Sequence, residues 1–222
     1  MKVVIIGNTG FIGHSIYNYL DKTKKYDLIG IPKNEIDLSG ENSSIALSKY
    51  LTANSIVVMC AGVKKQLGDN LDTFERNSAI INNFCRAISL VPPKKIIFFS
   101  SASVYGEDVD YDEKINEKTP VQPKTYYGIA KYTAERLIEK TCTENETELV
   151  ILRPPLIYGK NDHSRGYGPT GFTYKAINKE EIILWGDGSE FREFVYVEDV
   201  SKIISRLLNS DHNGVVNLVS GR

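Results

Sequence analysis

The chain has 222 residues, 41% of them hydrophobic, and this length and composition predict one large domain or a domain and a half with an ordinary core. The 27 basic and 28 acidic residues give a formal net charge of −1, which argues against nonspecific binding to nucleic acid or to a membrane surface. No apolar run approaches the length of a membrane span, and the first predicted strand starts at residue 2. We therefore expect neither a membrane segment nor a signal peptide.

The cysteines predict a reducing compartment. Cys60, Cys85 and Cys142 lie in or near apolar segments, and their spacing is not that of a metal site. We therefore expect reduced thiols in the core, no bound metal and a cytoplasmic protein.

The stretch from Met1 to Gly13 predicts a phosphate-binding turn. Val3 to Ile6 is an uninterrupted apolar run, typical of a parallel strand that is buried on both faces. Gly7, Gly10 and Gly13 follow, and a helical pattern of apolar residues comes next. The glycines permit a tight turn, close approach of a pyrophosphate and close helix packing, while the start of the helix offers N–H groups to the phosphates. The G-x-x-G-x-x-G spacing fits the general dinucleotide fingerprint loosely, so an ordinary glycine-rich turn is the alternative.

The end of the second predicted strand, residues 26–31, lacks the acid that often binds the ribose hydroxyls of NAD. Lys33 follows instead, and it could favour a 2′-phosphate or simply be a solvated loop residue. Asp37 is a candidate contact for the adenine or its ribose.

Strands and helices are expected to alternate along the rest of the chain, which predicts a doubly wound α/β (Rossmann) fold with a parallel sheet. The regular alternation of strands and helices ends near Arg153, so we expect an NAD(P)-binding domain at residues 1–153. A small substrate lobe is expected at residues 154–222, interleaved with returning elements of the first domain. Further strands are expected at residues 55–61, 95–99, 149–152, 182–185 and 215–219, helices at 43–51, 73–90, 125–141, 172–178 and 198–208, and a surface loop at 107–118. Residues 192–197 alternate between apolar and polar.

Tyr127 and Lys131 are the sharpest candidates for chemistry. They lie four residues apart in a predicted helix and project from one face. A lysine ammonium one turn away favours the phenolate, which lowers the tyrosine pKa and lets the side chain exchange a proton with a substrate hydroxyl. Tyr126 lies about 140° around the helix from Lys131 by the 3.6-residue period, so we discard it. The alternative is an amphipathic helix with an ordinary tyrosine and a solvated lysine.

Ser101 is the candidate hydroxyl beside the tyrosine. It follows the predicted strand at residues 95–99, and ligand sites in parallel sheets form outside the carboxyl ends of strands. Ser100 and Ser103 compete for this role, and ordinary turn chemistry is the alternative for all three serines.

Together these stretches resemble the extended short-chain dehydrogenase/reductase family, in its NAD-dependent epimerase/dehydratase group acting on nucleotide sugars. Any one stretch is a modest signal, whereas all of them in this order are highly specific. The matching stretches are Gly7-x-x-Gly10-x-x-Gly13, Ala61-Gly62-Val63-Lys64, Ser100-Ser101-Ala102-Ser103-Val104-Tyr105-Gly106, Tyr127-Gly128-x-x-Lys131, and Leu184-Trp185-Gly186-Asp187-Gly188 with Arg192 and Tyr196-Val197-x-Asp199-Val200.

The resemblance implies catalytic roles for Ser101, Tyr127 and Lys131, with Lys131 also binding the nicotinamide ribose. Arg192 would clamp the substrate diphosphate, with a surface ion pair to Glu190 or Glu193 as the alternative. Ser103 would lie near the substrate beside Ser101. The implied cofactor contacts are Gly7, Gly10, Phe11, Ile12 and Gly13 at the pyrophosphate, Lys33, Asp37 and Leu38 at the adenosine, and Ala61, Gly62, Lys64, Asn77, Tyr127 and Lys131 along the cofactor.

Residues that depart from the family pattern reduce the number of reactions expected for this chain. Ala102 and Ser103 stand where sugar-nucleotide 4,6-dehydratases carry Asp-Glu, so a dehydratase is not expected. The short connection from Ile31 to Asp37 resembles deoxysugar 4-ketoreductases, whereas the stretch from Ala61 resembles 4-epimerases. Pro154-Pro155 replaces an asparagine that helps to hold the substrate in many relatives. The chain also ends where relatives continue, which predicts either a fragment or a pared-down member.

The sequence therefore predicts an NAD(P)-dependent nucleotide-sugar epimerase that transiently oxidises the sugar C4, with NAD or NADP as cofactor. The alternatives are an NADPH-dependent 4-keto-deoxysugar nucleotide reductase and a non-catalytic NAD(P)-sensing module. The expected partner is a nucleotide-diphosphate sugar, with no nucleic acid and no membrane. A homodimer through the helices at residues 73–90 and 125–141 fits the habit of the family, although those faces could equally belong to the core of the monomer.

Overall fold

The computed structural model describes residues 1–107, 114–162, 168–184, 187 and 192–220. Strands and helices alternate along most of the chain, as the apolar pattern predicts. The elements in chain order are β1 (Lys2–Ile6), α1 (Phe11–Thr23), β2 (Asp27–Ile31), α2 (Ser43–Ser48), β3 (Ile56–Met59), the 3₁₀ helix η1 (Lys65–Leu67), α3 (Leu71–Leu90), β4 (Lys95–Phe99), the 3₁₀ helix η2 (Ala102–Tyr105), α4 (Tyr126–Glu144), β5 (Glu148–Arg153), β6 (Leu156–Tyr158), α5 (Gly168–Ile177), β7 (Phe194–Tyr196), α6 (Val197–Leu207) and β8 (Gly214–Asn217).

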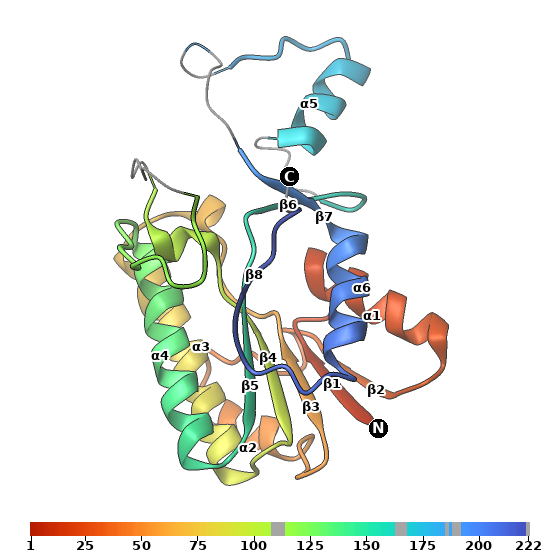
Figure 1. The fold of residues 1–222 in the computed structure, drawn as a ribbon, viewed down its shortest axis with the longest axis vertical. Coiled ribbons are helices and arrows are strands. Elements are labelled where there is room, and N and C mark those ends of the chain that lie inside the picture. The colour runs from red at the N-terminus through yellow and green to blue at the C-terminus, as the bar shows by residue number, and fades with distance from the viewer. Residues whose placement is uncertain (108–113, 163–167, 185–186, 188–191, 221–222) are drawn as a thin grey trace.

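A six-stranded parallel sheet with the order β2-β1-β3-β4-β5-β8 forms the centre of the molecule (Figure 1). In its register, Val3 lies beside Leu28 on one side and Ile56 on the other. The strand order reverses between β1 and β3, and ligands in such sheets bind outside the carboxyl ends of the strands at this point. The structure thus confirms the predicted doubly wound α/β fold.

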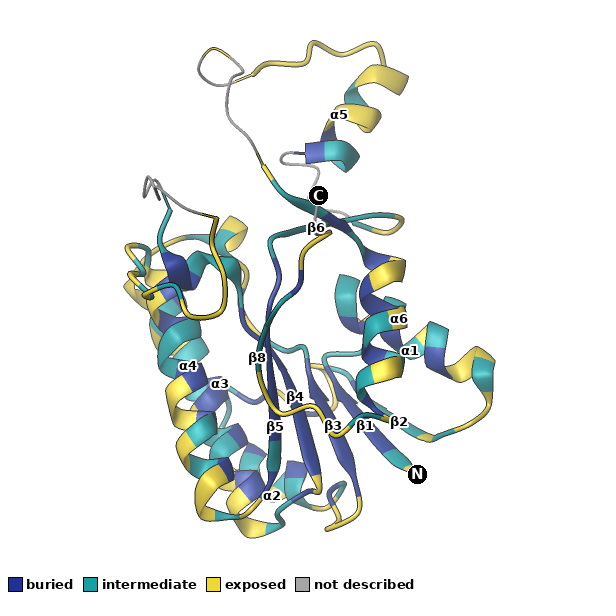
Figure 2. Cartoon of the chain, in the orientation of Figure 1, coloured by how far each residue is buried: buried dark blue, intermediate teal, exposed yellow. Residues whose placement is uncertain are grey.

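Helices cover both faces of the sheet (Figure 2). α1 and α6 pack together on one face, where Ile16 and Ile204 share a core with the inner strands. α2, α3 and α4 cover the opposite face, where Phe84 and Ile138 are fully buried. Because both faces are covered, the inner strands are continuous apolar runs, and their close packing fixes the positions of the loops at their carboxyl ends.

The chain leaves the sheet after β5 and later returns to it. β6 and β7 form a separate two-stranded parallel ribbon, and α5 lies beyond this ribbon at one end of the molecule (Figure 1). α6 then packs on α1, and β8 pairs with β5, which puts Asn217 beside Arg153. The division into domains at residues 1–153 and 154–222 stays a prediction. No helix within the described ranges has the length and apolar character needed to cross a membrane.

The strand predicted at residues 182–185 is wrong. Residues 182–184 form no strand, and the apolar side chains there are exposed. Trp185 lies outside the described residues. A short apolar run resembles a buried strand in sequence, but it becomes one only beside another strand to pair with.

Some helix boundaries also differ from the prediction. α5 is described from Gly168, four residues before the predicted start at residue 172, and Pro169 is tolerated in this first turn, where no N–H is needed. α3 begins at Leu71 because Asn70 and Thr73 form a capping box at its start. Of the predicted loop at residues 107–118, the described residues contain no helix or strand.

Candidate active site

The glycine turn between β1 and α1 is tightly built. Gly7 has a φ of +83°, and its N–H donates to the Ile31 carbonyl at 2.8 Å, which ties the turn to the end of β2. A Cβ on Gly13 would lie 2.3 Å from the Gly7 oxygen, so glycine alone lets α1 approach the turn this closely. Gly10 caps the helix without a side-chain hydrogen bond, and the first turn contains no acid. The N–H groups at Phe11, Ile12 and Gly13 therefore suit an anion.

Asn8 provides a test of whether this turn fits a dinucleotide. Within the described ranges, its Oδ1 is the one buried side-chain nitrogen or oxygen that has no hydrogen-bond partner. The amide occupies the space above Gly30, where a Cβ would lie 2.2 Å from its Nδ2. An unsatisfied buried acceptor costs about 1–3 kcal/mol, and a ligand donor would remove this cost. Together with the uncapped helix start, this acceptor makes the turn fit a bound dinucleotide.

The residues predicted for the adenosine end lie together after β2. The Asp37 carboxylate accepts hydrogen bonds from the Ser39 hydroxyl at 2.7 Å and the Ser39 N–H at 3.0 Å, and these bonds hold the pKa of Asp37 below its usual value. Lys33 Nζ lies 3.4 Å from the same carboxylate, in an exposed ion pair of little energy. The Leu38 side chain is buried in the core, and its carbonyl accepts from Asn83. Leu38 can therefore offer a cofactor only its backbone.

α4 presents Tyr127 at its first turn. The Thr125 hydroxyl accepts from the Gly128 N–H at 3.1 Å, and the Asp69 carboxylate accepts from the Tyr127 N–H at 2.9 Å. The Tyr127 ring centroid lies 5.8 Å from Lys131 Nζ, as the helical spacing predicts. The Tyr126 ring instead contacts Phe74, with 6.5 Å between ring centroids. The structure therefore places Tyr127 against the lysine.

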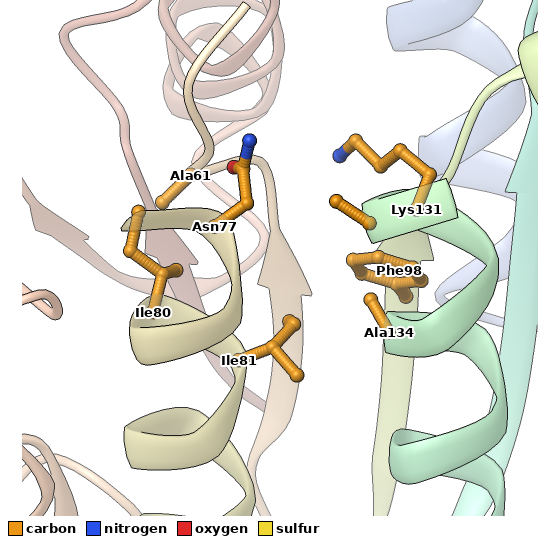
Figure 3. A pocket seen from close by; sticks show the side chains of 8 residues that line it. Ala61, Asn77, Ile80, Ile81, Phe98, Lys131 and Ala134 are labelled. Atoms are coloured by element: carbon orange, nitrogen blue, oxygen red, sulfur yellow. The ribbon is translucent and has the colours of Figure 1, made fainter. Parts of the chain in front are cut away.

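Lys131 lies where α4 meets the end of the sheet. Its ammonium donates to the Phe99 carbonyl at 2.8 Å, 5.2 Å from the centre of the Phe98 ring. Lys131 and Asn77 face the same small cavity of about 10 Å³ between α3 and α4 (Figure 3), which has room for about one water molecule. A Cβ on Gly62 would lie 3.6 Å from Lys131 Nζ and 3.4 Å from Asn77 Oδ1, so the glycine keeps this corner open.

The segment after β3 connects the lysine with the glycine turn. Asn77 accepts from the Val63 N–H at 2.8 Å and donates to the Val63 carbonyl at 3.1 Å, which fixes Ala61 to Lys64 against α3. Lys64 Nζ lies over the Phe11 ring, 5.9 Å from its centre. The predicted cofactor contacts at the turn, after β3 and on α4 thus form one continuous surface.

Burial lowers the pKa of Lys131 to about 8, against opposing effects of Cys60 and Glu135. The unfolded chain keeps the ordinary lysine pKa of about 10.4, so it binds more protons than the folded chain between about pH 8 and 10.5. The burial cost is therefore complete below pH 8 and disappears as the pH rises through this window.

We expect Lys131→Met to make this cost measurable. Relative to the variant, the wild type should gain about 1–3 kcal/mol of unfolding free energy between about pH 8 and 10.5. Urea unfolding of both proteins across this range measures the difference. Lys140→Met is the matched control, because Lys140 is exposed on the same helix in a surface pair with Glu144. Parallel curves for the wild type and Lys131→Met would contradict the expected burial of a charged lysine.

The structure separates the three serines after β4. The Ser100 hydroxyl is buried and donates to Glu135 at 2.5 Å. The Ser101 hydroxyl is half-buried and accepts from the Ser103 N–H at 3.1 Å, which leaves its own proton available to a ligand. The Ser103 hydroxyl donates to Glu107 at 3.2 Å, and Glu107 pairs with Lys65 of η1. Ser100 is thus committed to the interior, and Ser101 fits the catalytic role better.

Arg192, predicted to clamp the substrate diphosphate, is exposed and lies two residues before β7. Glu193, one of its predicted alternative partners, accepts from the Ser220 N–H at 2.7 Å, and Glu190 lies outside the described residues. The roles of Arg192 and Ser103 in substrate binding stay predictions.

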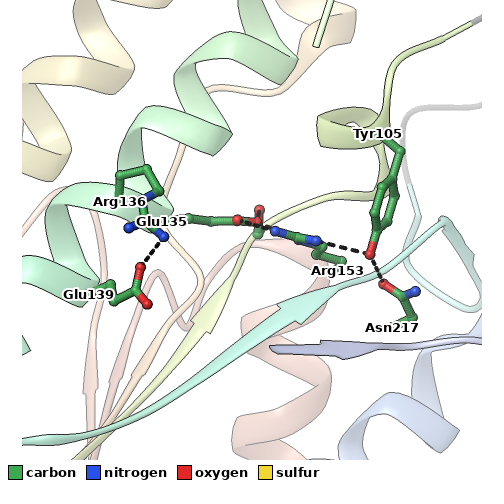
Figure 4. Close-up of polar contacts among 7 residues, drawn as sticks. Tyr105, Glu135, Arg136, Glu139, Arg153 and Asn217 are labelled. Atoms are coloured by element: carbon green, nitrogen blue, oxygen red, sulfur yellow. Dashed lines mark hydrogen bonds and ion pairs between the residues drawn. The ribbon is translucent and has the colours of Figure 1, made fainter. Parts of the chain in front are cut away.

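Sequence reasoning missed a buried polar network behind these residues. Glu135 on α4 pairs with Arg153 at the end of β5, and Arg153 also contacts Tyr105 of η2 (Figure 4). Glu135 comes four residues after Lys131, so the helical spacing that linked Tyr127 to Lys131 could have revealed it.

Comparisons with known proteins identify the family of the chain. Residues 3–218 match the family model described as NAD dependent epimerase/dehydratase family. A putative UDP-glucose 4-epimerase from Methanocaldococcus jannaschii is 28% identical over 99% of this chain and 77% of its own. The uncharacterized UDP-glucose epimerase YtcB from Bacillus subtilis is 26% identical over 96% of this chain and 74% of its own.

A solved structure extends the likeness to three dimensions. The UDP-N-acetylglucosamine 4-epimerase from Methanobrevibacter ruminantium M1 superposes with a TM-score of 0.84 at 25% identity, over 100% of this chain and 77% of that chain. The family model covers nearly the whole chain, and the relatives are named as enzymes, which confirms the family predicted from the motifs. The protein belongs to the NAD-dependent epimerase/dehydratase family of Rossmann-fold enzymes.

Proposed function

We propose that the protein is a nucleotide-sugar 4-epimerase in which Tyr127 is the acid and base. The observation that carries this proposal is the placement of the Tyr127 ring 5.8 Å from the Lys131 ammonium, beside the carboxyl ends of β3 and β4. The relatives named as UDP-glucose epimerases support a nucleotide sugar as substrate.

Proton transfer at the sugar would follow from the charge of Lys131. With its pKa at about 8, the ammonium stays protonated at neutral pH and favours the Tyr127 phenolate. The phenolate takes the proton of the sugar 4-hydroxyl while Ser101 donates a hydrogen bond to the same oxygen. Tyr127 would later return the proton to the C4 keto oxygen, which gives the alcohol of opposite configuration at C4. Bound NAD would supply the other half of the chemistry, accepting a hydride from C4 and returning it to the other face of the 4-keto sugar.

The residues that would hold the cofactor follow its length. The glycine turn with Phe11 and Ile12 would bind the pyrophosphate, and Asp37 would lie at the adenosine. Ala61, Gly62, Lys64 and Asn77 would lie along the nicotinamide half, and Lys131 would bind its ribose. The Asp37 carboxylate supports NAD rather than NADP, because a carboxylate can bind the ribose hydroxyls, whereas it would repel a 2′-phosphate.

Substrate contacts would come from Ser101, Ser103 and Arg192. Ser101 and Ser103 follow the end of β4, where the sugar would lie, and a guanidinium suits a diphosphate because it can bind two oxygens at once.

A homodimer and a cytoplasmic location remain part of the proposal. Exposed apolar side chains on α3 and α4, including Leu90 and Leu137, support a helix-to-helix contact between two copies.

The test uses purified protein without added reductant. The protein is incubated with UDP-glucose, UDP-N-acetylglucosamine and UDP-glucuronic acid, and products are separated by chromatography. We expect formation of the C4 epimer of one sugar and release of NAD on denaturation. Stoichiometric consumption of NADPH with a 4-keto sugar nucleotide would replace this proposal with a reductase. Tight NAD binding without turnover of any sugar would favour a sensing module.

A further inference from the structure

A charged pair is buried between α4 and the sheet, behind the proposed catalytic residues. Glu135 and Arg153 expose 2% and 7% of their side chains. Arg153 donates from Nη2 to Glu135 Oε2 at 2.6 Å and from Nε to Oε1 at 2.9 Å, a two-point contact (Figure 4). Burial alone would lower the pKa of Arg153, but the hydrogen bonds to Glu135 and Tyr105 outweigh this effect and hold the pKa above its usual value. The Arg153 guanidinium is therefore charged in the folded protein.

The pair holds both ends of the segment that carries Ser101. Before it, the Ser100 hydroxyl donates to Glu135 Oε1 at 2.5 Å. After it, the Tyr105 hydroxyl accepts from Arg153 Nη1 at 3.0 Å and donates to Asn217 Oδ1 at 2.7 Å. Ser101 lies between these two anchors, so its position follows from that of the ion pair.

The same pair is linked to Lys131 through α4. Glu135 lies one helical turn after Lys131 and two turns after Tyr127. Lys131 donates to the carbonyl of Phe99, and Glu135 accepts from the next residue, Ser100. Two successive turns of α4 thus hold two successive residues at the end of β4, which sets the distance between the helix and the strand end.

Stability alone does not account for this arrangement. Replacing a buried ion pair with apolar residues of similar volume is often neutral or stabilising, because both charges lose their hydration. We propose that Glu135 and Arg153 are positioning residues that place Ser101 and Lys131 relative to Tyr127. This inference rests on the proposed function, in which these three residues act on the sugar hydroxyl.

The positioning role predicts an electrostatic effect on Lys131. The charged and titratable groups that face its ammonium are Tyr127 and Glu135 from α4 and Cys60 from the end of β3. Burial raises the pKa of Cys60 to about 12, so its thiol is neutral at working pH. Glu135 is therefore the carboxylate that supports the lysine charge. Its loss should favour the neutral amine and weaken the Tyr127 phenolate.

The test compares Glu135→Gln with the milder changes Ser100→Ala and Tyr105→Phe, which each remove one hydroxyl. We expect each hydroxyl deletion to lower kcat about tenfold and Glu135→Gln to lower it about 100-fold, with KM within about twofold, because small misplacements of reacting groups are costly. Ser201→Ala is the matched control. Ser201 is buried on α6, on the opposite face of the sheet from α4, and its hydroxyl donates to Val197 and shares a hydrogen bond with the Ser15 hydroxyl of α1. This control should lower Tm as much as Ser100→Ala does and leave kcat unchanged.

A second readout needs no substrate. The phenolate absorbance of each protein is titrated with pH, and so is that of the same protein carrying Tyr127→Phe. The difference between the two titration curves gives the pKa of Tyr127. We expect Glu135→Gln to raise this pKa and Ser201→Ala to leave it unchanged. If the wild type turned over no sugar, the proposed function would fail while this titration still tested the positioning. If the wild type were active and the network variants kept both its kcat and its Tyr127 titration, the inference would be overturned and the function would stand. If Glu135→Gln does not fold, the kcat and Tyr127 pKa of Ser100→Ala and Tyr105→Phe test the inference in the same way.

Discussion

Tyr127→Phe is expected to lower kcat about 10²–10⁴-fold, the range for loss of a positioned acid and base. The change removes one oxygen and keeps the ring, so the contact with Lys131 and the cap from Asp69 on the backbone N–H are preserved. KM and the affinity for NAD should stay within about twofold, because uniform binding is not affected. Steady-state assays and titration of NAD by protein fluorescence measure the two effects separately.

Tyr126→Phe is the matched control for this experiment. Tyr126 is the neighbouring tyrosine of the same helical turn, but its ring lies against Phe74 and its side chain is exposed. We expect its kcat to stay within about twofold of the wild type, within the range of surface changes. Equal losses in the two variants would mean that neither hydroxyl is the acid and base. An active Tyr127→Phe protein would remove the central residue of the proposed mechanism.

Gly13→Ala is expected to disrupt both NAD binding and the packing of α1. The new Cβ would meet the Gly7 oxygen at 2.3 Å and the Gly7 carbonyl carbon at 2.9 Å, and both are backbone atoms that cannot turn away. Overpacking of this kind costs about 1–3 kcal/mol, which lowers the Tm of a chain of this size by about 2–12 °C. NAD should bind at least about 100-fold more weakly, because the first-turn N–H groups move with the helix.

Gly10→Ala separates binding from folding in the same turn. Its Cβ would meet a single atom, the Gly7 oxygen, at 3.3 Å, and its φ of −75° suits alanine. We expect a Tm within about 2 °C of the wild type and weaker NAD binding, because the methyl group occupies the space that the pyrophosphate needs. Calorimetry of Gly13→Ala and Gly10→Ala measures the Tm of each variant and its affinity for NAD, and so distinguishes a loss of stability from a loss of binding. Wild-type NAD affinity in both would place the cofactor away from this turn.

Much of the fold could be predicted because its signals are local. The buried strands are short apolar runs, and their alternation with amphipathic helices allows few arrangements other than a parallel sheet covered on both faces. The glycine spacing predicted the turn because Gly13 has no room for a side chain. The helical period similarly predicted that Tyr127, and not Tyr126, faces Lys131.

The features that could not be predicted from the sequence depend on contacts between distant parts of the chain. Ser100 and Ser101 are identical neighbouring side chains that only the family resemblance separates in sequence, whereas the structure separates them physically by burying Ser100 against Glu135. The helical spacing places Glu135 on the same face as Lys131, but its partner Arg153 belongs to another element, so no local pattern pairs the two. The apolar run at residues 182–184 failed as a strand for the same reason, since pairing requires a neighbour that the run itself does not encode.

The ribbon of β6 and β7 has a consequence for how such enzymes diversify. Leu156 lies beside Phe194, and Tyr158 lies beside Tyr196, with 5.5 Å between the two tyrosine rings. Residues 159–193 connect these two strands, so the segment starts and ends at neighbouring points of the ribbon. The entropy of closing such an excursion grows only with the logarithm of its length, about 0.6 kcal/mol for each doubling. Its length and sequence can therefore change over evolution at little cost to the stability of the sheet.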